Sequence, residues 1–162
     1  MKTFCLAAAL AAAALAAAAC AADAAGFTAL DRDTARRLGD PASHREPTVV
    51  ALWSTECVYC KKNLKLLGAL SRRAKPLKVI TVAAEAELPA SAAILDGHGV
   101  RGARYAYGAD APEALAYALD PTWQGELPRT LVFDGRGGKT ALSGGLDEAR
   151  VRQLLRAASA RP

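Results

Sequence analysis

Two cysteines separated by two residues, at the junction of an apolar run and an amphipathic stretch, constrain this chain more than any other feature. The run Thr48-Val49-Val50-Ala51-Leu52-Trp53 is short and rich in β-branched residues, which predicts a buried strand. From Cys57 onward, leucines recur at helical spacing with basic residues between them, which predicts a long helix that stops before Pro76. The pair Cys57-Val58-Tyr59-Cys60 therefore lies where a strand ends and a helix begins.

This position favours redox chemistry at the two thiols. At a helix start the first cysteine lies against unsatisfied backbone N–H groups and the positive end of the helix dipole, and both favour the thiolate that attacks disulfides. Cys60, one turn further on, is placed to resolve the mixed disulfide that Cys57 forms. Lys61 and Lys62 add positive charge nearby, whereas Glu56, directly before the pair, opposes them.

A structural disulfide and half of a metal site are the alternatives for this pair. A disulfide that closes so short a loop constrains the unfolded chain little, so it adds little stability. Zinc needs four ligands, and the remaining strong donors, His44 and His98, do not lie at ligand spacing from the cysteines. We therefore expect no metal, and we expect His98, between two glycines, to lie in an exposed loop.

Residues 1–24 show the three-part pattern of a secretory signal peptide. Lys2 precedes a long alanine-rich run that carries no charge until Asp23, where small residues offer a cleavage site. A retained membrane anchor is an alternative, although alanine is only weakly apolar. Lipid attachment at Cys20 is another, although an alanine occupies the position of the usual leucine three residues earlier. Export is the prediction, and it places the remaining cysteines where disulfides persist.

The composition excludes several classes of protein. A length of 162 residues suits one domain. Cys5 and Cys20 lie in the leader, so a scaffold built on several disulfides is excluded. The formal net charge is +5, but the arginines are scattered and are not interleaved with aromatic residues, which argues against a nucleic-acid surface. We expect a monomer that meets a membrane only through a retained leader or a lipid on Cys20.

Further elements follow from local patterns. Leu77–Ala83 is a second buried strand, so strand, helix and strand form a βαβ unit with parallel pairing. Residues 25–46 are expected to form an N-terminal extension, with a short helix over Thr28–Leu38, ahead of a domain over 47–162. The other expected elements are a helix from Ser91, a strand over Arg104–Tyr107, a helix over Pro112–Leu119 capped by Asp110, a hairpin over Thr130–Asp134 and Lys139–Leu142, and a last helix over Leu146–Ala158.

The arrangement resembles the thioredoxin superfamily, and within it the exported TlpA/ResA-like branch, over roughly residues 47–158. The resemblance lies in the strand that leads into the cysteine pair and in Glu126-Leu127-Pro128-Arg129 before a distant strand. It implies an α/β, thioredoxin-like fold, with a central mixed sheet flanked by helices and an extra strand and helix within 88–123. It also implies a cis peptide bond at Pro128, close to the cysteines.

The resemblance implies a role for each candidate site residue. Cys57 is the nucleophile, Cys60 resolves, and their redox-active disulfide takes the place of a cofactor. Leu127 presents backbone groups to a bound partner, as an added strand would. The other residues implied at the partner surface are Pro128, Val58 and Tyr59, with Trp53 packed beneath. The implied function is reduction of disulfides in exported proteins such as apocytochromes, with a membrane or periplasmic redox partner.

Three departures from the family leave alternatives open. Glu56 replaces an aromatic residue, the Val58-Tyr59 pair contains no proline, and Ala51 stands where thioredoxins often carry a buried aspartate. Glu56 and Glu126 are the candidates for the missing proton acceptor, although each also fits a surface carboxylate. A disulfide oxidase or isomerase is the alternative enzyme. A copper chaperone or redox-inert adaptor is the alternative outside enzymes, because two sulfurs bind Cu(I) acceptably.

Overall fold

A six-stranded mixed sheet forms the centre of the molecule. The structure, a computed structural model, describes residues 26–73 and 77–159, and the predicted leader lies outside them. The strand order is β1-β4-β3-β2-β5-β6. Strands β1 to β4 are mutually parallel, and β5 is antiparallel to both of its neighbours, β2 and β6. The strands are β1 (Thr28–Leu30), β2 (Thr48–Trp53), β3 (Lys78–Ala83), β4 (Arg104–Tyr107), β5 (Arg129–Phe133) and β6 (Lys139–Ser143). The predicted mixed sheet flanked by helices is confirmed.

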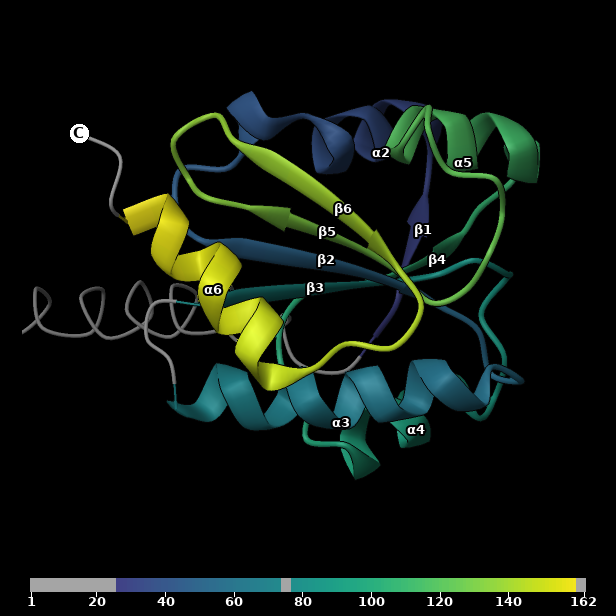
Figure 1. The fold of residues 1–162 in the computed structure, drawn as a ribbon. Coiled ribbons are helices and arrows are strands. Elements are labelled where there is room, and N and C mark those ends of the chain that lie inside the picture. The colour runs from purple at the N-terminus through teal and green to yellow at the C-terminus, as the bar shows by residue number, and fades with distance from the viewer. Residues whose placement is uncertain (1–25, 74–76, 160–162) are drawn as a thin grey trace, which may run out of the picture.

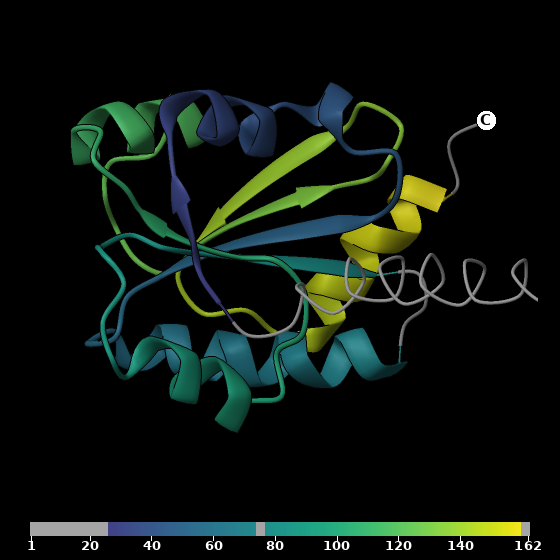
Figure 2. The same ribbon diagram turned by 180° about the vertical axis from the view of Figure 1, so that it is seen from behind.

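Helices cover both faces of this sheet. Figures 1 and 2 show α2 (Arg32–Gly39) and α5 (Pro112–Leu119) on one face, and α3 (Val58–Arg73) and α4 (Ser91–Gly97) on the other. The last helix, α6 (Glu148–Ser159), lies on the α3 side, and a short 3-10 turn, η2 (Pro41–Ser43), follows α2. Among the described residues, no helix is both long enough and apolar enough to cross a membrane.

The core is divided by β2, whose six residues are all buried. Successive side chains of a strand point to opposite faces. Val50 and Leu52 accordingly pack with α2 and α5, whereas Ala51 and Trp53 pack with α3. Cys60 belongs to the second group and has no exposed surface. The end of β2 and the start of α3 are therefore held by the same apolar cluster.

The neighbours of β2 bring a distant segment to the start of α3. On one side β2 pairs in parallel with β3, through to the pair Trp53 and Ala83. On the other side it pairs antiparallel with β5, and the last pair joins Leu52 to Arg129. Pro128, the residue before Arg129, therefore lies beside Trp53, at the edge of the sheet where α3 begins.

The N-terminal segment differs from the prediction. The helix expected over Thr28–Leu38 is the short strand β1 followed by α2. Asp31 ends the strand because its side chain accepts a hydrogen bond from the Thr34 N–H at 2.6 Å and caps α2. This bond lowers the pKa of Asp31. Since β1 pairs with β4 and Leu30 lies in the core, the structure draws no boundary at residue 47.

Two local predictions in the second half also need correction. Asp110 does not cap α5, which begins after Ala111 without a side-chain cap. The Asp110 carboxylate accepts a hydrogen bond from the Arg32 N–H at 2.9 Å and serves the first turn of α2 instead. His98 is half-buried, not exposed. It is the C-cap residue of α4, and its backbone N–H donates a hydrogen bond to the Ile94 carbonyl. The segment 88–123 contributes the strand β4 and two helices.

Candidate active site

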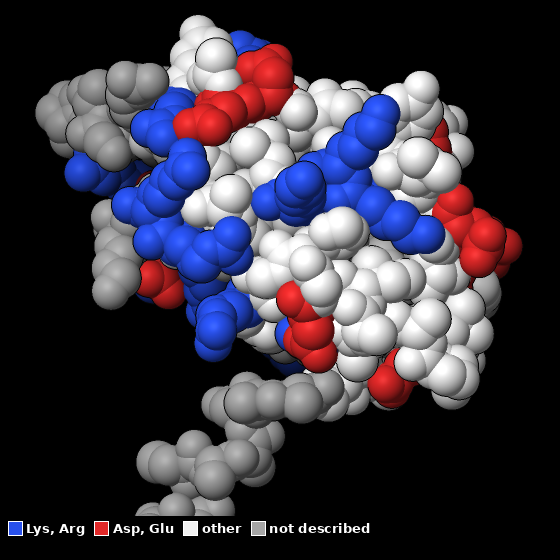
Figure 3. Space-filling model, turned by 90° about the horizontal axis from the view of Figure 1, so that it is seen from below, with Lys and Arg blue, Asp and Glu red and all other residues white. Residues whose placement is uncertain are grey.

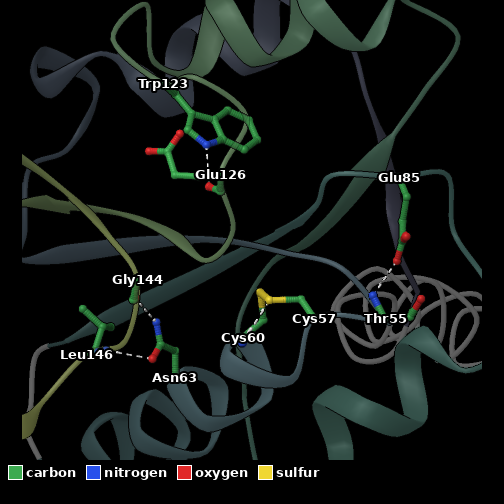
Figure 4. Close-up of a disulfide and its surroundings, with 9 residues drawn as sticks. All are labelled: Thr55, Cys57, Cys60, Asn63, Glu85, Trp123, Glu126, Gly144 and Leu146. Carbon is green, nitrogen blue, oxygen red and sulfur yellow. Dashed lines mark hydrogen bonds between the residues drawn. A yellow bond between two sulfur atoms is a disulfide. The ribbon is translucent and has the colours of Figure 1, made fainter.

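A disulfide joins Cys57 to Cys60 at the start of α3, with 5.2 Å between the two Cα atoms (Figure 4). The carbonyl of Cys57 accepts a bond from the Lys61 N–H at 3.3 Å, which opens the helical ladder. Its sulfur accepts a second bond, from the Cys60 N–H at 3.1 Å. Cys57 is therefore the N-cap residue of α3, and its Sγ occupies the acceptor position that a serine or aspartate oxygen usually takes. The same N–H would stabilise a thiolate there.

The two cysteines differ in their exposure to solvent. Cys57 is half-buried at the surface, whereas Cys60 is completely buried among Trp53, Leu64 and their neighbours. An external disulfide must reach the sulfur that attacks it, and a completely buried Cys60 does not allow this, whereas Cys57 lies partly at the surface. Trp53 is itself only 1% exposed, so it supports the pair from beneath and offers no surface of its own.

The turn that delivers Cys57 is held by a carboxylate from the next strand. Glu85 follows β3, and its Oε1 accepts a hydrogen bond from the Thr55 N–H at 2.6 Å. The Cys57 N–H bonds to the Ser54 carbonyl at 3.3 Å and closes the turn. Because β2 and β3 are parallel, their carboxyl ends meet at one edge of the sheet, and this places Glu85 beside the turn (Figure 4).

Leu127 and Pro128 form the second part of the site. Their peptide bond is cis, the isomer that the resemblance implies. Pro128 is buried, and Leu127 is half-buried. Leu127 packs against the apolar cluster that includes Cys60, and Cys57 packs against the same cluster. The Pro128 carbonyl accepts a hydrogen bond from the Gly144 N–H at 2.9 Å. Contact with a partner stays a prediction for all four residues of the implied partner surface: Leu127, Pro128, Val58 and Tyr59.

A buried amide connects the two parts of the site. Asn63, one turn after Cys60, is only 3% exposed. Its Nδ2 donates to the Gly144 carbonyl at 3.0 Å, and its Oδ1 accepts from the Leu146 N–H at 2.8 Å (Figure 4). Since Gly144 also bonds to Pro128, Asn63 fixes the distance between the helix of the cysteines and the loop that supports Pro128.

We expect Asn63→Ala to lower the free energy of unfolding by about 1–3 kcal/mol, because it removes two hydrogen bonds of a buried amide and leaves the half-buried Gly144 and Leu146 without these partners. Urea unfolding of the oxidised protein measures this loss. Gln153→Ala, at an exposed position of α6, is the control and should change the value by less than about 0.5 kcal/mol. Equal effects of the two substitutions would contradict the linking role of Asn63.

A buried ion pair anchors the loop before Leu127. The side chains of Asp120 and Arg129 are 3% and 10% exposed, and two guanidinium nitrogens donate to Asp120 Oδ2 at 3.0 and 2.6 Å. The other guanidinium bonds reach Thr122, Glu126 and Ser143. Arg129 therefore ties the end of α5, the loop and β6 together immediately after Pro128.

The candidate proton acceptors lie at the surface. Glu126 is exposed, and its carboxylate accepts a hydrogen bond from the Ser143 hydroxyl, which lowers its pKa, and one from Arg129. Figure 4 shows this carboxylate directed away from the disulfide. Glu56 is exposed beside Cys57. Glu126 therefore serves its own loop here, and no contact of Glu56 with the sulfurs is present among the described residues.

The described residues contain no group of three or more His, Cys, Asp and Glu side chains that could hold a metal ion. His44, one of the two histidines, is a core residue: its ring stacks on Phe133 with 3.9 Å between centroids. Its Nε2 lies 3.0 Å from the Leu38 carbonyl oxygen.

Sequence reasoning missed Asn63, Glu85 and the pair of Asp120 and Arg129. Asn63 interrupts the apolar face of a predicted helix, and Arg129 precedes a buried strand, so a polar residue at an expected core position was the available signal. Glu85 had the weaker signal of a carboxylate just beyond a buried strand. Their partners lie far away in the sequence, and no local pattern indicates them.

Neither the family models nor the curated proteins compared with the sequence match it. Solved structures do match. A secreted disulfide oxidoreductase of Mycobacterium tuberculosis, homologous to Escherichia coli DsbE, is 14% identical with a TM-score of 0.59, over 75% of this chain and 97% of that chain. A thiol-disulfide isomerase of Corynebacterium glutamicum is 15% identical with a TM-score of 0.62, over 85% and 91%.

A thiol:disulfide interchange protein of the thioredoxin family from Chlorobium tepidum is 19% identical with a TM-score of 0.53, over 84% of this chain and 94% of that chain. The chain therefore has the fold of thioredoxin-like thiol-disulfide oxidoreductases. It also carries a CxxC disulfide at the start of the helix that follows β2. The resemblance that the sequence indicated is confirmed at the level of the fold.

Proposed function

We propose that this protein is a thiol-disulfide oxidoreductase that works through Cys57 and Cys60. One observation carries the proposal: the sulfur of the half-buried Cys57 accepts a helix N-terminal N–H, while its disulfide partner Cys60 is completely buried. The first feature favours a thiolate at the surface, and the second keeps the resolving thiol away from external disulfides. A disulfide with a purely structural role requires neither.

The exchange proceeds in two steps. In the reduced protein the Cys57 thiolate attacks one sulfur of a partner disulfide, and the other partner sulfur leaves as a thiolate. The Cys60 thiolate then attacks Cys57, forms the disulfide seen here and releases the first partner sulfur. The partner gains two electrons and two protons, and the protein loses the same. A dithiol protein must reduce the pair again.

The proposed direction is reductive, and the proposed location is the periplasm. The leader pattern of residues 1–24 supports export, and one protein of similar fold is described as secreted. The proposed substrates are disulfides of exported proteins such as apocytochromes, which follows from the resemblance to the TlpA/ResA-like branch. A membrane or periplasmic dithiol protein is the proposed electron donor, and attachment to the membrane would require the leader or a lipid on Cys20.

Reduction of insulin by the purified protein, with dithiothreitol as donor, tests the activity. We expect insulin to precipitate faster than with the donor alone, because the pair relays electrons to the insulin disulfides. The reduction potential then tests the direction: a value near that of strong oxidants, about −120 mV, would assign an oxidase instead. Tight Cu(I) binding together with no turnover would overturn the proposed activity in favour of a copper chaperone.

A further inference from the structure

The exposed face of α3 carries an apolar patch beside the reactive sulfur. Val58 and Tyr59, the two residues between the cysteines, are 64% and 63% exposed. Isolated apolar residues on a surface are ordinary, but these two adjoin Cys57 in the first turn of the helix. A partner whose disulfide meets Cys57 must therefore cover them.

The same face carries positive charge. Lys61, Lys62 and Lys65 follow Val58 at intervals of three, four and seven residues, which places all four on one side of a helix. We call the three lysines the basic stripe. They form no ion pair among the described residues, and α3 contains no acidic residue from Val58 to Arg73. Figure 3 views the molecule from this side and shows Lys and Arg side chains gathered over it.

The start of α3 lacks the negative charge that stabilises a helix N-terminus. Cations are unfavourable near a helix N-terminus, where the dipole and the free N–H groups favour negative charge. The first turns of α2, α5 and α6 each contain an acidic residue, Asp33, Glu113 and Glu148, whereas the first turn of α3 contains none. The positive charge of the lysines that follow the cysteines is therefore not offset by an acidic residue on α3.

A cation–π contact joins the charged and apolar groups into one surface. The Nζ of Lys62 lies 5.1 Å from the centroid of the Tyr59 ring. Lys62 and Lys65 are exposed and Lys61 is half-buried, so all three lysines reach the surface of α3 beyond Cys57. Glu56 is the acidic residue directly before Cys57, and it confines the positive region to the α3 side.

We propose that Val58, Tyr59 and the basic stripe form a docking surface for protein segments that carry acidic side chains close to their disulfide. This inference rests on the proposed function and names its substrate class. Opposite charges speed encounter and orient the partner, and the apolar pair covers the disulfide during exchange. The acidic groups of the partner lie over α3, and its backbone reaches toward Leu127.

An anionic membrane would meet the same charges, but the arrangement favours a protein segment. The exposed apolar residues on this stretch of α3 are two, and both adjoin Cys57. Insertion of that end into a bilayer would therefore cover the sulfur that must receive the partner. A helix that lies on a membrane needs a longer apolar face, whereas the side of α3 opposite the stripe is buried in the core.

The test compares three substrates: two peptides that share one disulfide ring and differ in flanking aspartates or lysines, and the small neutral 2-hydroxyethyl disulfide. The variant is Lys61→Gln, Lys62→Gln and Lys65→Gln together. The control is Arg45→Gln, Lys78→Gln and Arg101→Gln, which removes the same charge at exposed positions near the opposite edge of the sheet. The readout is kcat/KM at low and high salt.

We expect the wild type and the control to reduce the acidic peptide faster than the basic one, and high salt to remove the difference. The variant should lose about tenfold in kcat/KM on the acidic peptide and less than about twofold on the neutral disulfide. An equal loss on all three substrates would overturn the proposal, since the lysines would then act on the Cys57 thiolate itself.

Two other results would also overturn the docking proposal. Equal rates for both peptides in the wild type would show that the charges do not select a partner. Binding of the wild type to vesicles that contain phosphatidylglycerol, with loss of peptide reduction, would assign the face to a membrane. Absence of reaction with any of the three substrates would instead contradict the proposed function, so the two failures are distinguishable.

Discussion

Cys60→Ser protein mixed with an oxidised peptide should accumulate in a covalent complex through Cys57, whereas Cys57→Ser protein should form no complex and reduce nothing. Cys57 is only half-buried and its sulfur caps the helix, while Cys60 is completely buried. Without Cys60 the mixed disulfide cannot be resolved from within the chain. We expect the reduction rate of Cys57→Ser to fall below about one thousandth of the wild-type rate, as loss of a catalytic nucleophile commonly does.

Mass spectrometry under non-reducing conditions measures the complex, and peptide mapping identifies the sulfur that carries the partner. Alkylation of the reduced wild type by iodoacetamide is the companion measurement, and Cys57 should react first. The double variant Cys57→Ser, Cys60→Ser is the control for attachment elsewhere. A complex on Cys60 in the Cys57→Ser protein, formed as fast as the one on Cys57, would reverse the assigned order of attack.

Arg129→Met should lower the free energy of unfolding by about 3–5 kcal/mol, because it leaves the Asp120 carboxylate buried without its main partner. Arg152→Met is a matched control, since Arg152 pairs with Glu148 at 2.6 Å but both side chains are nearly half exposed. That surface pair should contribute no more than about 1 kcal/mol. Chemical unfolding of the oxidised proteins measures both values, and a small loss in Arg129→Met would contradict the anchoring role.

The ion pair also makes the stability depend on pH. Burial raises the pKa of the Asp120 carboxyl, but hydrogen bonds from Arg129 and Thr122 outweigh it, so the pKa lies below its ordinary value. The contribution is therefore present above the pKa of the unfolded chain, about 3.9, and is lost as the pH falls through the lower folded value. In acid the wild type should lose more stability than Asp120→Asn; parallel pH curves would contradict this.

Local patterns were sufficient for the part of the fold that contains the cysteines. The apolar runs and β-branched content of β2 and β3, and the leucine spacing of α3, are properties of neighbouring residues, so the βαβ unit could be predicted. β1 could not, because three residues carry too short a pattern and its strand character depends on pairing with β4. The residues of β1 were therefore included in the helix predicted over Thr28–Leu38, of which only the part that is α2 is helical.

The site divides in the same way. Cys57 and Cys60 are recognisable from their spacing and from the elements around them. Asn63 is bonded to Gly144 and Leu146, about eighty positions along the chain, and those contacts exist only once the sheet has formed. Arg129 and Asp120 are closer in sequence, but their pairing depends on the burial of both, which composition does not indicate.

The hydrogen bond from the Cys60 N–H to the Cys57 sulfur has a consequence for observing the protein at work. Most backbone N–H groups of a helix donate to carbonyl oxygens, and these acceptors do not change when a surface group reacts. The Cys60 N–H instead donates to the Cys57 sulfur, the atom whose covalent bonding changes at every stage of exchange. We therefore expect the resonance of the Cys60 amide to differ between thiolate, mixed disulfide and closed disulfide, so that it reports on exchange without an added label.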